Sequence, residues 1–229
     1  MEHIWEFRWL LLQGTGITIL VGVASLVLAI VLGLLGAWAK LSKNAMAQRA
    51  ANGYTTLIRG IPDLVLMLIL FFGGQQLLLD IGEKTGLWGY VEINQFTAGV
   101  GTIGFIFGAY MTETFRGAIL AIPRGQIEAG IACGMSKSLI FRRIIWPQMV
   151  RYALPSFTNN WLVMIKTTAL VSVLGLQELV YVANAVGRKF REPFTFLLFV
   201  LVVFLLLTAV SQLGLRKLEK KYSVGIRRG

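Results

Sequence analysis

Charged residues are absent from three long, strongly apolar stretches of this 229-residue chain. The stretches lie between Arg8 and Lys40, between Glu92 and Glu113, and between Glu192 and Arg216. A helix rises about 1.5 Å per residue, so about 20 apolar residues are enough to cross the hydrocarbon core of a bilayer. Each of the three stretches is therefore long enough to form a transmembrane helix.

Two further apolar stretches are interrupted by charge. Residues 60–79 contain only Asp63, whereas residues 152–186 contain Lys166 and Glu178. The second of these is long enough for one span followed by a re-entrant or interfacial piece. We therefore expect five transmembrane helices, at residues 14–39, 60–79, 95–115, 155–177 and 194–215.

Six spans are the main alternative to five. A further crossing would have to fit within residues 170–187, where Gln177, Glu178 and Asn184 are costly to place in lipid. The whole chain is 56% hydrophobic and 14% charged, with a mean hydropathy of +0.70. A soluble domain of this length cannot bury so much apolar surface. We expect an all-α polytopic membrane protein in which residues 1–229 form a single domain, because no repeat or linker interrupts the sequence.

The positions of the basic residues predict an orientation in the membrane. The net charge is +11, and cytoplasmic loops of membrane proteins are rich in Lys and Arg, so no nucleic-acid partner is needed to explain it. Residues 40–59, 116–151 and 216–228 hold 16 of the 22 basic residues and share one side of a five-span chain. We expect a cytoplasmic carboxyl terminus and a periplasmic amino terminus. The cluster at 188–191 disagrees, because it would lie outside.

Several kinds of chemistry are excluded by residue types. The single cysteine, Cys133, and the single histidine, His3, leave no disulfide framework and no Cys- or His-based metal or catalytic site. The amino terminus lacks the basic region of a cleavable signal peptide. An intramembrane enzyme, which needs a nucleophile–base pair or metal ligands, is therefore disfavoured.

The basic segment from Arg116 to Arg151 carries helix signals of its own. Pro123 is a plausible helix start and Gly134 a plausible helix end. Ser136 would cap a second helix over residues 137–145, and Pro147 is expected to end it, because proline cannot continue the hydrogen-bond ladder. The alternative is an ordinary basic loop, but a loop of about 35 residues is long for a compact protein.

One set of residues in this segment has a characteristic order and spacing: Glu128, Ala129, Gly130, Gly134, Ile144 and Pro147. The set resembles the "EAA" loop of permease subunits in bacterial ATP-binding-cassette importers. Alanine is usual at Gly130 and leucine at Trp146, so this sequence departs mildly there. The resemblance implies that residues 119–151 form a cytoplasmic coupling loop. This loop would dock on a separate ATPase and switch the spans between inward-facing and outward-facing states.

Three other segments, residues 59–63, 112–118 and 166–172, are similar to the polar amino acid permease family. Residues 53–60 and 222–225 resemble in particular its permeases for histidine, lysine, arginine and ornithine. The likeness implies a type I importer permease of the bacterial inner membrane. Its expected substrates are amino acids, and the subgroup points to the basic ones. A permease for another polar amino acid, or a stand-alone carrier or channel, is the alternative.

The resemblance also implies partners. These are a homologous second permease, with a heterodimer favoured over a homodimer, an ATPase dimer and a periplasmic substrate-binding protein. ATP and Mg would be bound by the ATPase, because this chain has no Gly-x-x-x-x-Gly-Lys-Ser/Thr loop, and the segment 134–138 is only a near-match. We expect no cofactor and no enzyme activity on this chain.

Four ionisable residues lie within the expected spans: Asp63, Glu113, Lys166 and Glu178. Such residues are expensive in lipid, so each is a candidate for contact with substrate. We predict that Asp63 and Glu178 help to bind a cationic amino acid near the middle of the membrane. The alternative is that the acids pair with Arg59, Arg116 or Lys166, and Glu113 is three residues before Arg116 on one helix face.

Hydroxyl groups flank Lys166 and are candidates to bind the substrate backbone. They belong to Thr167, Thr168 and Ser172. The alternative is that each hydroxyl bonds a carbonyl in the preceding helical turn.

Overall fold

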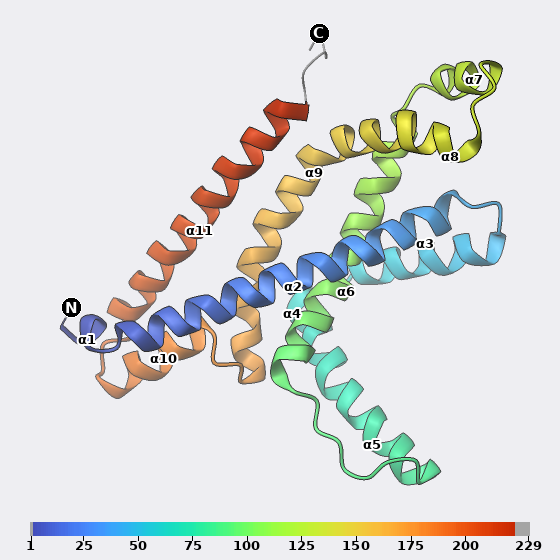
Figure 1. Cartoon of the computed structure of the whole chain (residues 1–229). Helices are drawn as coiled ribbons and strands as arrows, with labels where there is room; N and C mark the ends of the chain where they lie inside the picture. Colours follow the sequence, from blue (N-terminus) through green and yellow to red (C-terminus); the bar gives the residue numbers. More distant parts are fainter. Residues whose placement is uncertain (1, 223–229) are drawn as a thin grey trace.

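The computed structural model describes residues 2–222, and all regular structure within them is helical, as the sequence predicts (Figure 1). The tail motif at 222–225 lies outside the described residues except for Tyr222. The α-helices are α1 (Glu2–Glu6), α2 (Arg8–Leu41), α3 (Ala45–Arg59), α4 (Asp63–Leu68), α5 (Gly74–Thr85), α6 (Gln95–Leu120), α7 (Arg124–Ala132), α8 (Lys137–Ile140), α9 (Trp146–Thr167), α10 (Leu179–Lys189) and α11 (Pro193–Tyr222). Shorter π or 3-10 segments cover Ile69–Gly73, Phe141–Ile145 and Thr168–Leu174.

Three helices of the described chain are long and apolar enough to cross a membrane: Arg8–Leu41, Asp63–Thr85 and Pro193–Tyr222. A fourth candidate is the pair Lys137–Leu174 and Leu179–Lys189, which are bent by 53° at their junction. Helix α6 is 26 residues long and contains the span expected at 95–115, but it is not among these candidates. Its glycines and threonines dilute its apolar residues, so the expected count of five spans is not confirmed.

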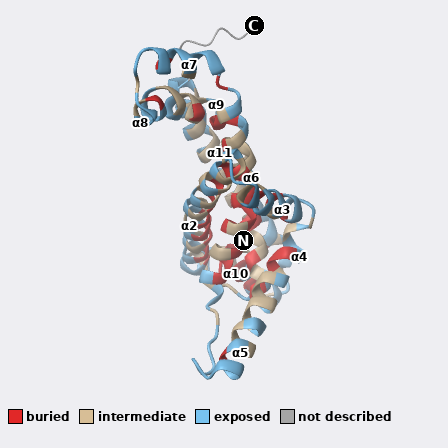
Figure 2. Cartoon of the chain, turned by 90° about the vertical axis from the view of Figure 1, so that its right-hand side faces the viewer, coloured by how far each residue is buried: buried red, intermediate tan, exposed pale blue. Residues whose placement is uncertain are grey.

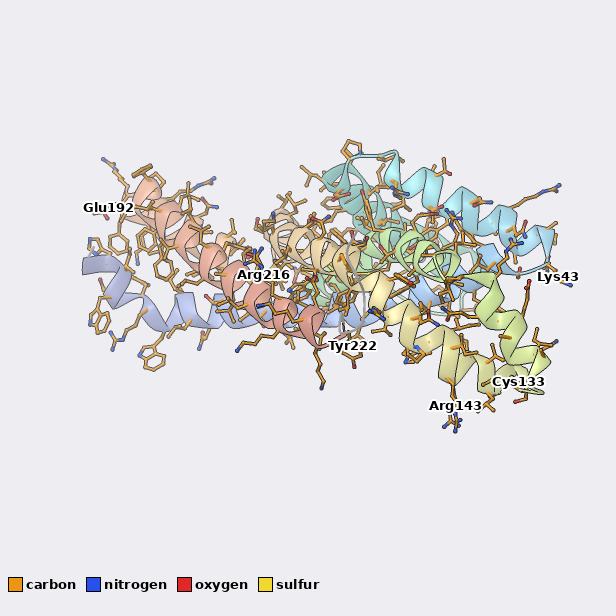
Figure 3. The ribbon with its side chains drawn as sticks, turned by 90° about the horizontal axis from the view of Figure 1, so that it is seen from above. Lys43, Cys133, Arg143, Glu192, Arg216 and Tyr222 are labelled. Carbon is orange, nitrogen blue, oxygen red and sulfur yellow. The ribbon has the colours of Figure 1, made fainter. Side chains whose placement is uncertain are left out.

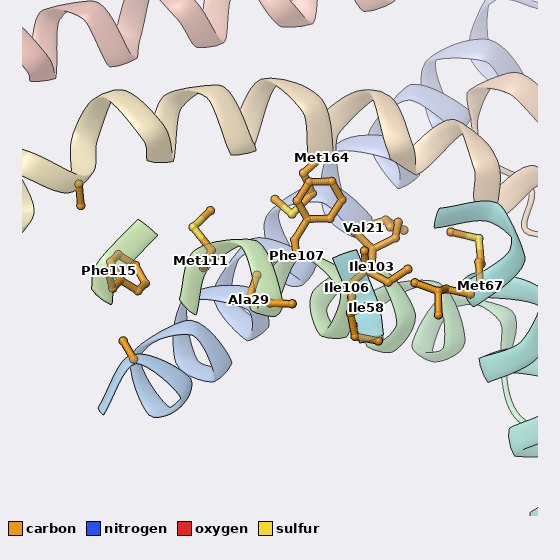
Figure 4. Close-up of a cluster of buried hydrophobic side chains, with 14 of the residues drawn as sticks. Val21, Ala29, Ile58, Met67, Ile103, Ile106, Phe107, Met111, Phe115 and Met164 are labelled. Carbon is orange, nitrogen blue, oxygen red and sulfur yellow. The ribbon is translucent and has the colours of Figure 1, made fainter. Parts of the chain in front are cut away.

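Helix α6 is the centre of the packing, because α2, α3 and α9 all lie against it (Figures 1 and 4). Small residues bring α2 and α6 close together, as in other membrane helix pairs. A Cβ added at Gly33 of α2 would lie 2.4 Å from the Cβ of Met111, and one at Gly104 of α6 would lie 2.6 Å from Leu28. The two backbones therefore meet at a distance that no larger side chain permits.

Helix α3 is an element that the hydrophobic pattern did not reveal. Asn44 caps it by accepting from the backbone N–H groups of Met46 and Ala47. Its buried face carries Ala51 and Thr55, and Tyr54 donates a hydrogen bond to a carbonyl of α6. Burial raises the pKa of Tyr54 to about 12, so the hydroxyl keeps its proton and this bond even at a pH where an exposed tyrosine would ionise.

A second apolar cluster joins the amino-terminal end of α2 to α10 and α11. Leu11, Leu179 and Phe196 are fully buried there. The basic cluster that disagreed with the expected orientation lies at the end of α10, where Lys189 is 5.4 Å from the ring centroid of Phe190. Helix α10 has 11 residues, about 17 Å, and is too short for the further crossing that six spans would need.

The expected end of the second loop helix at Pro147 is wrong. The helix that begins after Ser136 continues through a π-helical segment into α9, without a break until Leu174. Pro147 lies directly after the π-helical segment Phe141–Ile145, where the hydrogen-bond register already changes, so its ring and its missing N–H do not break the helix. The flanking residues of the expected loop are also helical, because Arg116 belongs to α6 and Arg151 to α9.

Candidate functional site

A polar pocket of about 490 Å³ lies between α3, α6 and α9. Its lining residues are Arg59, Tyr110, Glu113, Thr114, Pro155, Ser156, Asn159 and Asn160. The residues from α9 fall near the middle of that helix, where polar groups are costly unless they face a cavity or another helix. Their clustering makes this pocket the candidate site.

The groups in the pocket form a linked arrangement. The Arg59 guanidinium lies 5.6 Å from the ring centroid of Tyr110. Asn160 donates a 3.0 Å hydrogen bond to the hydroxyl of Thr114. Pro155 cannot donate a helical hydrogen bond, so it weakens the ladder of α9 beside the pocket. One cation, one carboxylate and several neutral donors and acceptors thus lie near one opening.

Glu113 forms the inner wall of the pocket and is held by two cations. It forms an ion pair with Lys40 of α2, and its other oxygen is 2.9 Å from a guanidinium nitrogen of Arg116. Lys40 also donates a 2.6 Å hydrogen bond to the hydroxyl of Thr55. The contacts among Lys40, Thr55 and Glu113 join α2, α3 and α6. Glu113 also pairs with Arg116, which was the alternative to a role in binding substrate.

Glu178 lies elsewhere and caps α10. Its carboxylate accepts from the backbone N–H groups of Val180, at 3.0 Å, and Tyr181, at 2.9 Å. It also accepts from the hydroxyl of Thr18 at 3.2 Å, and only 1% of the residue is exposed. The Glu178 carboxylate is thus bonded to groups of the protein and is buried, so it is not open to a substrate.

The hydroxyls near Lys166 bond to their own helix, which was the alternative to binding the substrate backbone. Thr167, Thr168 and Ser172 each donate to a backbone carbonyl three or four residues earlier. Lys166 itself is exposed on α9.

The residues predicted for one site therefore divide into two groups. Glu113 contacts Lys40, and Glu178 contacts Thr18, 22 residues earlier on the continuous helix α2. At 1.5 Å per residue these contacts are about 33 Å apart, too far for one amino acid to touch both. Of the residues predicted to bind substrate, Glu113 lines the polar pocket, and Asp63 begins α4, four residues after the lining residue Arg59.

Sequence reasoning missed most of the pocket. Arg59 was considered only as a partner for acids, and Tyr110, Asn159 and Asn160 were not considered. The signal that could have found them is the close grouping of Ser156, Asn159 and Asn160 near the start of an expected span. These polar residues carry no charge, so a search for ionisable residues passes over them.

The segment with the coupling motif projects from the body of the molecule as α7 and α8 (Figures 1 and 2). Glu128 and Ala129 are exposed on α7, whereas Gly130 is buried against Ile144. A Cβ at Gly130 would lie 3.0 Å from the end of the Ile144 side chain, so the unusual glycine permits close packing. Gln148 of α9 adds a 2.6 Å hydrogen bond to Gln126, which fastens α7 to the long helix.

Gly134 ends the turn after α7 in the left-handed conformation, with φ of +75°, as expected for a helix terminator. Replacing it with alanine is expected to destabilise this turn by about 1 kcal/mol, because a Cβ disfavours that conformation. Amide hydrogen exchange in residues 133–136 should accelerate about fivefold. Gly125→Ala is the control, since it lies in open space on α7 with an ordinary backbone. Equal exchange in the two variants would contradict the prediction.

Comparisons with known proteins agree with this geometry. Residues 29–224 match the family described as "Binding-protein-dependent transport system inner membrane component". The chain is 48% identical to the histidine/lysine/arginine/ornithine transport system permease protein HisQ of Escherichia coli, over 98% of each chain. It is 42% identical to the octopine transport system permease protein OccQ of Rhizobium meliloti, over 96% of this chain and 92% of the relative.

Solved structures show the same fold. A crystal structure of an amino acid ABC transporter with histidines matches with a TM-score of 0.79 at 26% identity, covering 96% of this chain and 97% of the other. An inward-facing structure of the methionine ABC transporter MetNI matches with a TM-score of 0.73 at 18% identity, covering 95% and 98%.

Proposed function

Since this chain belongs to the family of inner membrane components of binding-protein-dependent transport systems, we propose that it is the translocation subunit of an ATP-driven amino acid importer. The observation that carries the proposal is the open polar pocket at the middle of α9. Basic amino acids are the favoured substrates, because the relatives at 48% and 42% identity are named for histidine, lysine, arginine, ornithine and octopine transport.

The pocket offers complementary groups to both ends of an amino acid. Arg59 would bind the α-carboxylate, because a guanidinium donates two parallel hydrogen bonds to a carboxylate. Asp63, which begins α4 four residues after Arg59, would attract the ammonium or a cationic side chain. Glu113 is already paired with Lys40 and Arg116, so it would shape the pocket rather than bind the ligand. The volume of about 490 Å³ lies within the ~300–1,000 Å³ typical of small-molecule sites.

The segment 119–151 would transmit the work of an ATPase. Its exposed helix α7 carries Glu128 and Ala129 on a surface suited to a groove on that partner. Gly130, Gly134, Ile144 and Pro147 would fix its geometry, through the packing and turn described above. An ATPase pair that binds ATP and Mg, a homologous second permease and a periplasmic substrate-binding protein would complete the transporter.

The proposed topology has five spans, with α6 as the third. Helix α6 is surrounded by α2, α3 and α9, so little of it needs to be apolar enough to face lipid. The carboxyl terminus and α7 would then be cytoplasmic, and the amino terminus periplasmic, in a bacterial inner membrane. The cation–π contacts of Lys189 would lower the cost of the basic cluster on the outer side.

Uptake by the assembled transporter in proteoliposomes tests the site. Arg59→Gln is expected to raise the KM for arginine about 10- to 100-fold, the range for a lost hydrogen bond to a charged group of about 1.5–3 kcal/mol. Asp63→Asn should have a similar effect on arginine and a smaller effect on a neutral amino acid.

Two variants serve as controls. Arg49→Gln removes an exposed arginine from the same helix, α3, and should leave KM unchanged. Glu178→Gln should also retain binding, because that residue caps α10 about 33 Å away. Wild-type uptake by Arg59→Gln, or a greater loss in Glu178→Gln, would show that the substrate binds elsewhere.

A further inference from the structure

An apolar crevice of about 220 Å³ opens between α2, α6, α9 and the end of α11. All of its lining residues are apolar, among them Ile30, Phe115, Phe157, Trp146 and Leu218. Trp146 is 43% exposed and Leu218 is 40% exposed, so both lie at the mouth rather than in the interior. The crevice is thus suited to a hydrocarbon chain that enters from outside the protein.

Basic residues lie close in the sequence to both residues at the mouth of the crevice, Trp146 and Leu218. Arg142 and Arg143 precede Trp146 by about one turn of the same continuous helix, and Lys217 and Lys221 flank Leu218 on α11. Figure 3 shows Arg216 and Tyr222 along α11, and Arg143 on the helix that leads into α9.

Glu219, the acidic neighbour of Leu218 in the sequence, is engaged by α9. It accepts a 2.7 Å hydrogen bond from Thr158. That bond ties the two helices together next to the crevice. The four basic residues that neighbour Trp146 and Leu218 in the sequence outnumber this carboxylate.

We propose that the crevice is a binding site for an anionic phospholipid. One acyl chain would lie against Phe115 and Phe157, the glycerol would lie near Trp146, and the phosphate would lie among the four basic residues. Tryptophan favours the level of the lipid headgroups, with its ring partly in the hydrocarbon. The second chain would follow the exposed apolar face of α11, where Val210 is 69% and Leu213 is 61% exposed.

The charge of the mouth is what selects an anionic lipid over a zwitterionic one. Basic side chains beside a membrane are attracted to anionic headgroups, and the attraction is additive over several residues. An apolar crevice alone would accept any acyl chain. The combination of an enclosed apolar wall and four cations specifies both parts of the ligand.

Quenching of Trp146 fluorescence tests the site in the assembled transporter. The chain has six tryptophans, so the Trp146 signal is the difference between the wild type and Trp146→Phe. Phosphatidylglycerol with brominated acyl chains, titrated into detergent solution, should quench this signal at lower concentration than brominated phosphatidylcholine with the same chains. Lys217→Gln and Lys221→Gln should each weaken the phosphatidylglycerol response about fivefold, as expected for one basic residue at an anionic surface.

Lys43→Gln is the matched charge control, because Figure 3 places Lys43 far from Arg216 and Tyr222. It should leave the titration unchanged. Equal quenching by the two lipids would overturn the selection of an anionic headgroup. Absence of a quenchable Trp146 component with either lipid would overturn the occupancy of the crevice. If Lys43→Gln weakened the phosphatidylglycerol response as much as Lys217→Gln does, the lipid preference would reflect the net charge of the protein, and the proposed headgroup site would be overturned.

Discussion

Gly33→Leu should prevent recovery of correctly folded protein, and Gly33→Ala should lower the midpoint of thermal unfolding in detergent by about 2–12 °C. A Cβ at Gly33 would lie 2.4 Å from the Met111 Cβ and 3.0 Å from the Met111 backbone carbon. Because the obstruction includes backbone, α2 would have to move away from α6. Overpacking of this kind typically costs about 1–3 kcal/mol, and a chain of this size loses about 2–4 °C per kcal/mol.

Gly16→Ala and Gly16→Leu are the matched controls, because Gly16 lies on the same helix with nothing within 4 Å of an added Cβ. Both should fold, and alanine there should be neutral or slightly stabilising, since it favours helix more than glycine does. Equal midpoints for Gly33→Ala and Gly16→Ala would mean that α2 and α6 are further apart in the folded protein than the structure has them.

Glu113→Ala should destabilise the chain by about 3–5 kcal/mol, because it leaves the ammonium of Lys40 buried without its carboxylate. The Lys40 side chain is only 8% exposed, and its remaining partner, Thr55, is neutral. Removing both charges in Glu113→Ala/Lys40→Met should restore a large part of the loss. Thermal or denaturant unfolding of the four proteins in this mutant cycle measures the coupling directly.

Arg116→Ala is the informative contrast within the same ion-pair group. Its side chain is 38% exposed, so its pair with Glu113 is screened by solvent and should contribute less than about 1 kcal/mol. Failure of Lys40→Met to rescue Glu113→Ala would show that Glu113 stabilises the fold through other contacts. A larger loss in Arg116→Ala than in Glu113→Ala would assign the main pair to Arg116.

The sequence predicted best those helices that only need to be long and apolar enough to cross the membrane. Helices α2 and α11 were expected at 14–39 and 194–215, because an uninterrupted apolar stretch has few other uses. Helix α3 escaped notice because its buried face is made of small and polar residues such as Ala51 and Thr55. Helix α3 packs on α2 and α6, and Ile58 is its one apolar side chain larger than alanine that is fully buried, so its pattern does not indicate a span.

The candidate site was predicted less well, for a related reason. An acid within an apolar span was treated as a ligand for substrate, but Glu178 accepts two backbone N–H groups at the start of α10. No periodicity distinguishes a capping acid from a binding acid before the break at 175–178 is known. The continuation of the helix through Pro147 was also hidden, because the π-helical segment before it changes the hydrogen-bonding register.

The continuous helix from Lys137 to Leu174 connects the projecting segment to the polar pocket without an intervening loop. Figure 1 shows this helix turning where α8 leads into α9, and Ser156 of the pocket lies about half-way along its length. At about 1.5 Å per residue, roughly 29 Å of helix separates Lys137 from Ser156. A displacement of the projecting segment would therefore reach the wall of the pocket through the backbone of one helix.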